Sequence, residues 1–245
     1  MVRFGDGYRN SSQYKYRGTH VSTMRTTRRS YLAAAGGALA ATAGCLGGSD
    51  SQSKPSCEVG DLEQVKSLPT PTLGPEDADV TVDVYEDFAC PHCATYNVDV
   101  FPKVKQNYID TGKIRYRFFD FPIPVSKQWS WGGAIAARAV QDRTDDETYF
   151  KYAKRLFEKQ NELTSNGYTV IHDVANEFDV DGCEVMASVE QDIYRSVVKS
   201  DRQRGIEVDI GGTPAIIVNG EHLSGAGWET VKNGIEGHLK SASKS

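Results

Sequence analysis

Apolar and polar residues alternate near residue 80, and this alternation predicts the first strand of the chain. In segment 80–84, valines occupy every second position with polar residues between them, which is the period of a strand. Segment 114–119, Ile-Arg-Tyr-Arg-Phe-Phe, predicts a second strand. The helix expected between them contains Pro102, which should kink or divide it. Together these segments predict a βαβ unit with a right-handed crossover.

The C-terminal part predicts two short strands and a final helix. Segment 215–220, Ala-Ile-Ile-Val-Asn-Gly, is an apolar strand that ends in an Asn-Gly turn. Segment 221–224 is expected to be the return strand. From 228 to 239, apolar residues recur at the spacing of a helix face. The predicted order of elements is therefore βαβ, an insertion, and ββα.

The insertion, at about 128–208, predicts helices. Segment 130–140 is rich in alanine, and segments 170–178 and 185–206 have further helical patterns. Segment 146–163 carries apolar and aromatic residues at helical spacing, namely Tyr149, Phe150, Tyr152, Ala153, Leu156 and Phe157. We interpret this stripe as a core face and not as a ligand site.

The tetrapeptide Cys90-Pro91-His92-Cys93 lies between the first predicted strand and its helix. Pro91 suits the first helical turn, which places Cys90 at the helix N-terminus. Unpaired backbone N–H groups and the helix dipole favour a thiolate there, and cysteines so placed in CxxC motifs have pKa values of roughly 3.5–7.5. Cys93 lies one turn further and can close a disulfide with Cys90. The motif predicts two-electron dithiol chemistry.

Metal binding is the alternative interpretation of this motif. A zinc site needs two further ligands, but the chain has no second CxxC and its other histidines are scattered singly. Haem attachment requires CxxCH, and Ala94 follows Cys93. We therefore predict no metal and no organic cofactor, only a redox-active disulfide.

Several ionisable residues near the motif have two interpretations each. His92 either lowers the pKa of the neighbouring thiol or is simply solvated. Glu86 and Asp87 either accept a proton from Cys93 or cap the loop, and capping is the interpretation we favour for both. The remaining histidines of the domain are expected at the surface: His172, His222 and His238.

The Cys-Pro-His-Cys motif, the tripeptide Gly212-Thr213-Pro214 and the order of strands together resemble the DsbA-like thiol–disulfide oxidoreductases of the thioredoxin superfamily, over about residues 80–239. The resemblance implies an α/β thioredoxin fold with a helical insertion of the DsbA type. It also implies that Cys90 is the nucleophile, Cys93 the resolving cysteine and His92 a group that stabilises the thiolate. Pro214 would be a cis-proline that lines the substrate groove.

The resemblance implies an enzyme that introduces or exchanges disulfides in exported proteins with free thiols and is reoxidised by a quinone-linked membrane partner. We expect a monomer. Thr213 departs from DsbA, which has valine at this position, and threonine occurs there in other branches that include isomerases. The alternatives are therefore a surface thiol reductase or isomerase, for example in cytochrome c maturation, and a tethered copper-binding module with Cys90 and Cys93 as soft ligands.

Residues 24–45 predict an export signal. Arg28 and Arg29 lie in Thr-Arg-Arg-Ser-Tyr-Leu, which resembles a twin-arginine signal. The apolar stretch 31–46 is shorter than the about 20 residues that span a bilayer, and small residues precede the expected cleavage point, as in a signal peptide. The alternative is an exposed arginine pair before an alanine-rich helix. We expect translation to start at Met24, so that residues 1–23 are not part of the protein.

Cys45 ends the sequence Thr-Ala-Gly-Cys, which resembles a lipobox. It predicts a lipid anchor on the extracytoplasmic face of the membrane, with a plain secreted protein as the alternative. The polar segment 46–60 is expected to be a flexible tether. The domain would then occupy residues 61–245.

The composition also indicates that the domain after the leader is acidic. The chain has 28 Lys and Arg against 33 Asp and Glu, a net charge of −5, and its leader is basic. No basic stripe follows the leader, which excludes a nucleic-acid-binding domain. An acidic domain behind a twin-arginine lipoprotein signal resembles proteins of halophilic archaea.

Two cysteines remain unassigned by the signals described above. Cys57 lies near the start of the domain and Cys183 lies in the helical insertion. Outside the cytosol, an even number of remaining cysteines indicates a structural disulfide. Two buried free thiols are the alternative.

Overall fold

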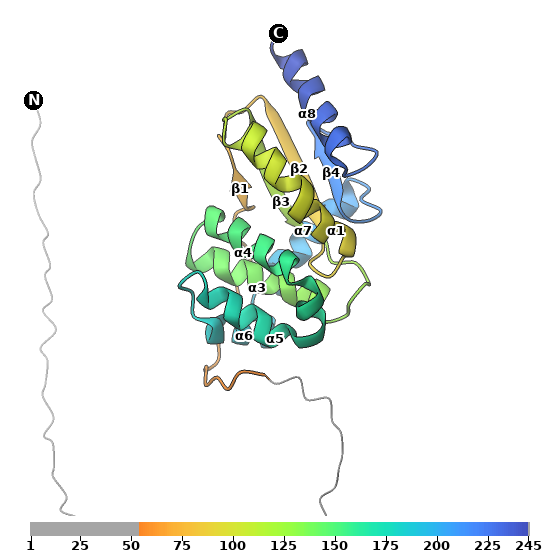
Figure 1. Ribbon diagram of the computed structural model, residues 1–245. Coiled ribbons are helices and arrows are strands. Elements are labelled where there is room, and N and C mark those ends of the chain that lie inside the picture. The colour runs from red at the N-terminus through yellow and green to blue at the C-terminus, as the bar shows by residue number, and fades with distance from the viewer. Residues whose placement is uncertain (1–53, 245) are drawn as a thin grey trace, which may run out of the picture. The chain divides into compact units, whose positions relative to one another are not determined.

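In the part of the chain that the structure describes, a sheet of five strands forms the centre of the fold (Figure 1). The computed structural model describes residues 54–244. The strands are β1 (Thr72–Leu73), β2 (Val80–Glu86), β3 (Ile114–Asp120), β4 (Ala215–Val218) and β5 (Glu221–His222), in the spatial order β1-β3-β2-β4-β5. β2 and β3 are parallel, from the pair Val80–Ile114 to the pair Glu86–Asp120. β4 runs antiparallel to β2, and β5 antiparallel to β4.

The strands predicted from alternation are present, and the βαβ and ββα units are confirmed. Asn219 and Gly220 have φ values of 47° and 87°, so both lie in the left-handed region that an Asn-Gly hairpin turn requires. The return strand covers Glu221–His222 only. β1 was not predicted, because two residues are too short to show a period. It pairs antiparallel with β3.

The helix after the motif is not divided at Pro102, because the backbone at Val100, Phe101 and Lys105 stays helical and only the hydrogen-bond spacing changes. It comprises α1 (Pro91–Thr95), a π-helical segment (Tyr96–Val100), α2 (Phe101–Val104) and a second π-helical segment (Lys105–Ile109). Pro102 has no backbone N–H to donate to the preceding turn. The hydrogen bonds before it take the longer π spacing, and the N–H of Phe101 donates to the carbonyl of Tyr96.

The insertion is helical, and its helices gather at one end of the sheet (Figure 1). They are α3 (Trp129–Arg143), α4 (Asp146–Glu158), α5 (Gln160–Asn176), α6 (Gly182–Glu190) and α7 (Arg195–Glu207). The final helix α8 (Trp228–Ala242) packs against β2 and β4. The aromatic stripe of α4 is buried in the core, as predicted.

Two helix boundaries depart from the expected pattern. A single helix over 146–163 is wrong, because the backbone leaves helical geometry at Lys159 (φ −99°, ψ 19°) and Leu163 belongs to α5. Segment 185–206 forms two helices. Asp192, with φ 54°, lies between them, and the N–H groups of Asp192 and Ile193 donate to the carbonyls of Val189 and Ser188. This is the Schellman arrangement that ends a helix.

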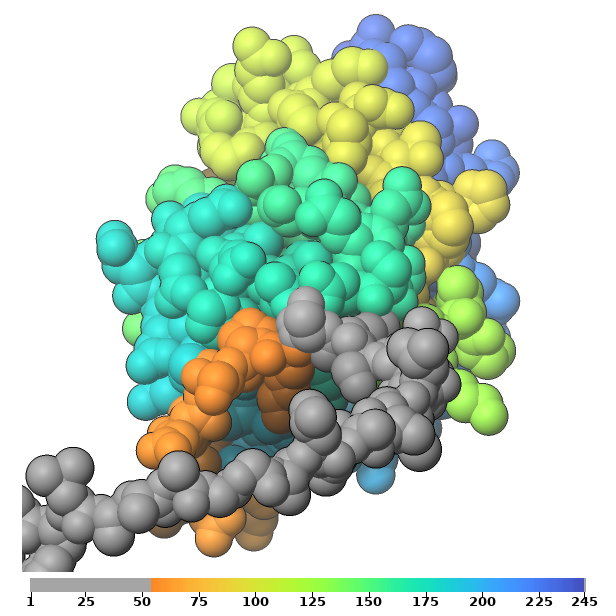
Figure 2. Space-filling model, turned by 60° about the horizontal axis from the view of Figure 1, so that its bottom comes forward, coloured from red at the N-terminus to blue at the C-terminus, as the bar shows by residue number. Residues whose placement is uncertain are grey.

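The N-terminal segment 54–71 lies along the insertion (Figure 2). The side-chain oxygen Oε1 of Gln191 accepts a hydrogen bond from the N–H of Leu62 at 2.8 Å, and Nε2 of Gln191 donates to the carbonyl of Gly60 at 3.0 Å. The N–H of Val65 donates to the carbonyl of Ile193 at 3.1 Å. Residues 54–60 of the expected tether therefore have defined contacts. The leader, Arg28, Arg29, Cys45 and residues 46–53 lie outside the described residues.

No helix among residues 54–244 is both long enough and apolar enough to span a bilayer.

A buried arginine connects the sheet to the insertion. The side chain of Arg138 on α3 is fully buried and donates to Asp120 of β3 at 2.6 Å. It also donates to Asp201 of α7 and, at 2.9 Å, to Gln141. Because a charge in the interior needs partners, these contacts fix α3, α7 and β3 relative to one another.

We predict that Arg138→Met destabilises the protein by about 3–5 kcal/mol, because it leaves two carboxylates buried without their cation. Urea unfolding measures the change. Arg155→Met is the matched control: Arg155 forms an ion pair with Glu177 on the surface, and its loss should cost no more than about 1 kcal/mol. Equal effects of the two substitutions would contradict the role assigned to Arg138.

Candidate active site

The Cys-Pro-His-Cys motif forms the first turn of α1. Cys90 is the N-cap residue with an extended backbone (φ −80°, ψ 119°), and Pro91 occupies the first helical position. The N–H of Cys93 donates to the carbonyl of Cys90 at 3.0 Å. Both cysteines are free thiols, and their exposed fractions are 3% for Cys90 and 0% for Cys93. The sequence alone predicts this local geometry.

The pKa values of the two thiols are shifted in opposite directions. The pKa of Cys90 is lowered from 9.0 to about 5. The largest cause is a hydrogen bond from the thiol of Cys93, and the side chain of Thr213 and the backbone N–H groups of Cys93 and His92 add to it against the cost of burial. Burial raises the pKa of Cys93 well above its usual range, and its bond to Cys90 and the charge of Glu86 act in the same direction. The reduced pair therefore holds a thiolate on Cys90 and a thiol on Cys93.

His92 contributes to this site through its backbone. Its N–H is among the groups that lower the pKa of Cys90, whereas its side chain is exposed. Any additional stabilisation of the Cys90 thiolate by the imidazole of His92 would come from a charge on the ring at the mouth of the site.

The loop before β4 supplies the other wall of the site. The Thr213–Pro214 peptide bond is cis. The thiol of Cys90 lies 3.4 Å from the carbonyl oxygen of Thr213. The hydroxyl of Thr213 is buried and has no hydrogen-bond partner among residues 54–244, so it is free to donate to the thiolate.

A groove of about 340 Å³ opens beside the motif. Its lining is mostly apolar and consists of His92, Thr95, Tyr96, Val100, Thr213, Pro214, Ala226 and Gly227. The sequence indicated His92, Thr213 and Pro214, but it missed the others, because Thr95, Tyr96 and Val100 look like ordinary helix positions and Ala226 and Gly227 like loop. A groove of this size and polarity suits an extended apolar peptide segment.

Asp87 and Glu86 differ in role, although they are adjacent. Asp87 caps the loop, because its carboxylate accepts from the N–H groups of Ala89 and Ile123, both at 2.7 Å. Glu86 is 1% exposed, and its Oε2 accepts from the side chain of Asn97. Its Oε1 has no partner among the residues that the structure describes. Burial raises the pKa of Glu86 well above its usual range.

Asn97, one turn further along the motif's own helix, and Gln160, on α5, hold the motif in place. The amide of Asn97 also donates to the carbonyl of Cys93 at 3.3 Å, so it connects Glu86 to the motif. Gln160 of α5 donates to the carbonyls of Phe88 and Cys90, both at 2.9 Å. Sequence reasoning missed Gln160, and no local signal points to it, because it lies 70 residues from its partner.

Cys57 and Cys183 form a disulfide with their Cα atoms 5.5 Å apart. It joins the N-terminal segment 54–71 to the start of α6, so neither of its cysteines belongs to the motif helix α1. His222 and His238 lie in exposed or partly exposed positions, as expected, and His238 contacts Glu221 at 3.1 Å.

Comparisons with known proteins agree with this geometry. A family model described as Thioredoxin matches residues 66–236. Disulfide bond formation protein D of Bacillus subtilis is 28% identical over 176 residues, which cover 69% of this chain and 77% of that protein. Probable disulfide bond formation protein D of Bacillus anthracis is 28% identical over 175 residues, or 69% and 78%.

Solved structures show the same similarity. The crystal structure of oxidised BdbD from Bacillus subtilis has a TM-score of 0.64 and 27% identity, and the match covers 73% of this chain and 100% of that chain. Chlamydia trachomatis DsbA has a TM-score of 0.60 at 18% identity, with 76% of this chain and 98% of that chain covered. The α/β fold with its helical insertion is thus shared with these structures.

We predict that Cys90 titrates with a pKa of about 5 in the reduced chain, with Cys45 replaced by serine, while Cys93 stays protonated at neutral pH. Cys93→Ala removes the strongest hydrogen bond to the thiolate and should raise the pKa of Cys90. Cys93→Ser keeps a hydroxyl donor and should raise it less. Thiolate absorbance against pH measures both. A Cys90 pKa near about 8.5 in the parent chain, the value of a free thiol, would contradict the prediction.

Proposed function

We propose, because this chain belongs to the thioredoxin family and is a DsbA-like protein-disulfide oxidoreductase, that its Cys90–Cys93 pair acts mainly as an oxidant of thiols in exported proteins. The observation that carries the proposal is the unequal acidity of the two sulfurs, with a stabilised thiolate on Cys90 and a buried thiol on Cys93. The apolar groove beside them suits an unfolded polypeptide segment as the substrate.

The proposed reaction begins with the Cys90–Cys93 disulfide. A substrate thiolate attacks the sulfur of Cys90, the Cys90–Cys93 bond breaks, and Cys93 leaves with the electron pair and takes up a proton. A second substrate thiolate then attacks the substrate sulfur of the mixed disulfide and releases Cys90 as a thiolate. The substrate gains a disulfide and loses two electrons, which the reduced pair holds. Reoxidation by a quinone-linked membrane partner would return the enzyme to its starting state.

Electrostatics favour this direction. The hydrogen bonds around Cys90 stabilise its thiolate, whereas a disulfide carries no charge and gains little from the same donors. Stabilising the reduced form makes the pair a stronger oxidant. Each tenfold stabilisation of the thiolate is about 1.4 kcal/mol, or about 30 mV for a two-electron couple.

Glu86 is our candidate for the proton carrier of Cys93. It is buried beside the resolving cysteine, its raised pKa lets it hold a proton, and one of its oxygens has no hydrogen-bond partner among the described residues. A neutral carboxyl can protonate Cys93 as that sulfur leaves, and the carboxylate can take the proton back during reoxidation.

Export and anchoring complete the proposal. The basis is the sequence 24–46, with Arg28 and Arg29 before a short apolar stretch and Cys45 at its end. We propose that a twin-arginine signal exports the folded domain and that lipidated Cys45 holds it on the extracytoplasmic face of the membrane. The acidic domain behind such a signal supports a halophilic archaeal source.

We predict a reduction potential more oxidising than about −200 mV, measured at equilibrium with glutathione. A potential near that of thioredoxin, about −270 mV, would favour a reductase instead. His92→Ala keeps the backbone N–H and removes only the imidazole, so the fold should persist while the potential becomes more reducing. The exposed His222 on β5 provides the control, because His222→Ala should leave the potential unchanged. No shift in His92→Ala would remove the imidazole from the mechanism.

We predict that Glu86→Gln slows the step in which Cys93 displaces a substrate from Cys90 by about 100-fold, the lower end of what general acid–base catalysis contributes. The measurement is the rate of peptide release from a preformed mixed disulfide on Cys90. The reduction potential of the variant is measured in parallel, since a structural disturbance of the site would shift the potential as well as the rate, whereas loss of a proton carrier alone would change the rate. Release at the parent rate would show that Glu86 carries no proton.

For the anchor, we predict that Cys45→Ser releases the protein from the membrane or leaves it unprocessed. Replacing Arg28 and Arg29 by lysine should block export, because the twin-arginine pathway reads the arginine pair. Cell fractionation distinguishes these outcomes. A parent protein found free in the medium, with its N-terminus beyond Cys45, would disprove the lipid anchor while leaving the redox proposal intact.

A further inference from the structure

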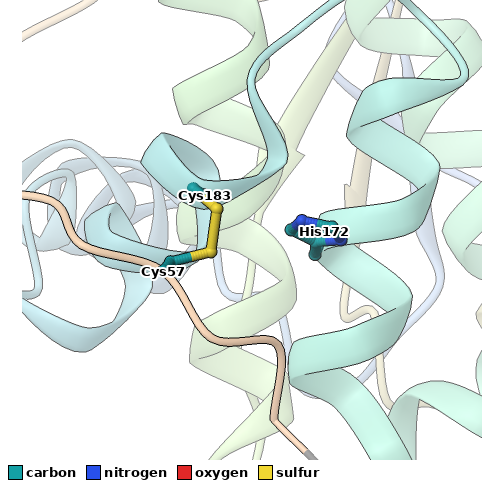
Figure 3. A group of neighbouring side chains, drawn as sticks. All are labelled: Cys57, His172 and Cys183. Carbon is teal, nitrogen blue, oxygen red and sulfur yellow. A yellow bond between two sulfur atoms is a disulfide. The ribbon is translucent and has the colours of Figure 1, made fainter.

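Three potential metal ligands meet away from the active site, although they are far apart in the sequence (Figure 3). Cys57 comes from the N-terminal segment 54–71, Cys183 from the start of α6 and His172 from α5. The two sulfur atoms and a ring nitrogen of His172 all lie within 4.8 Å of one another. All three residues are partly exposed, so a solvated ion can reach them.

The backbone at His172 packs closely against Gly182 at the start of α6. A Cβ atom on Gly182 would lie 2.3 Å from the carbonyl oxygen of His172 and 2.8 Å from its Cδ2 atom, which is bonded to Nε2. Only glycine allows this approach, and Gly182 directly precedes Cys183. The Cδ2 atom of the imidazole, which is bonded to Nε2, therefore lies against the start of α6.

Asp173 fixes the other nitrogen of the ring. Its carboxylate contacts Nδ1 of His172 at 2.7 Å. A metal-binding histidine is commonly oriented in this way, with a carboxylate on one nitrogen and the metal on the other. The bond leaves Nε2 as the nitrogen available to a ligand between the helices.

The N-terminal segment is held in place by contacts other than the disulfide. Leu62 and Gly60 bond to Gln191, Val65 bonds to Ile193, and Lys54 forms an ion pair with Glu190. Reduction of the disulfide therefore leaves Cys57 beside Cys183. Their Cα separation of 5.5 Å suits two thiolates on one ion. In a tetrahedral zinc site, with Zn–S bonds of about 2.3 Å, the sulfur atoms are about 3.8 Å apart.

We propose that Cys57, Cys183 and His172 form a zinc-binding site that the Cys57–Cys183 disulfide masks and that reduction opens. An external dithiol donates two electrons and two protons, the S–S bond breaks, and the dithiol becomes a disulfide. Zn²⁺ then displaces the two thiol protons and binds two sulfurs and Nε2 of His172. The fourth position remains open to water. The site holds the N-terminal segment on α6 in the reduced state, as the disulfide does in the oxidised state.

The test uses the full chain with Cys45, Cys90 and Cys93 replaced by serine, so that only the proposed thiols remain. The chain is reduced with a phosphine, which contains no thiol, and titrated with Co²⁺ as the spectroscopic probe, followed by Zn²⁺. We expect one Co²⁺ per chain, with thiolate-to-cobalt absorption that Zn²⁺ abolishes. The oxidised chain should show no such absorption.

His172→Ala should weaken cobalt binding by at least about 10-fold, the lower end of the cost of losing even an outer partner of a metal ligand. The exposed His222 is the matched control, and His222→Ala should bind as the parent does. Absence of thiolate-to-cobalt absorption in the reduced chain, or absorption of equal affinity in His172→Ala, would overturn the proposal.

If reduction unfolds the chain, circular dichroism measures whether Zn²⁺ restores the fold. A reduced chain that unfolds and then refolds when Zn²⁺ is added would support the site, because metal binding would then supply folding free energy. A reduced chain that stays unfolded with Zn²⁺ present would overturn it. Neither result depends on the direction of the Cys90–Cys93 reaction.

Discussion

The structure depends on keeping the first turn of α1 against the loop before β4. The donors that lower the pKa of Cys90 come from both, namely Cys93 and His92 on one side and Thr213 on the other. Sheet topology enforces this meeting. β2 ends at Glu86 and its antiparallel neighbour β4 begins at Ala215, with Tyr85 paired to Ala215. The residues after β2 and before β4 must therefore emerge at the same edge of the sheet.

The helical insertion completes the site from outside the sheet. Gln160 holds the backbone of the motif, and Asp87 accepts a bond from Ile123 in the chain that leads into the insertion. The insertion can position these groups only if it is itself fixed, which is what Arg138 and its buried carboxylates do. The Arg138 network thus has a consequence for thiol chemistry, since a small displacement of a donor weakens a hydrogen bond steeply.

Two adjacent acids illustrate how burial decides chemistry. Both carboxylate oxygens of Asp87 accept backbone N–H groups, whereas Glu86 is buried and its Oε1 has no hydrogen-bond partner among the described residues. In the sequence they are equivalent, and capping was the favoured interpretation for both. That interpretation holds for Asp87. For Glu86, the raised pKa and an Oε1 atom without a hydrogen-bond partner among the described residues are the basis of the proposed proton-carrier role, because buried groups with shifted pKa values cluster at functional sites.

The sequence by itself determined the features that depend on a few consecutive residues. Alternation placed β2 and β3, Pro91 placed Cys90 at a helix N-terminus, and Asn219-Gly220 placed the hairpin turn. Tertiary structure decided the rest: the end of α4 at Glu158, the bond from Gln160, and the position of His172 beside the disulfide of Cys57 and Cys183. The reason is physical. Local propensities act within one or two turns, whereas contacts between residues 70 or 126 positions apart exist only because packed helices and strands bring them together.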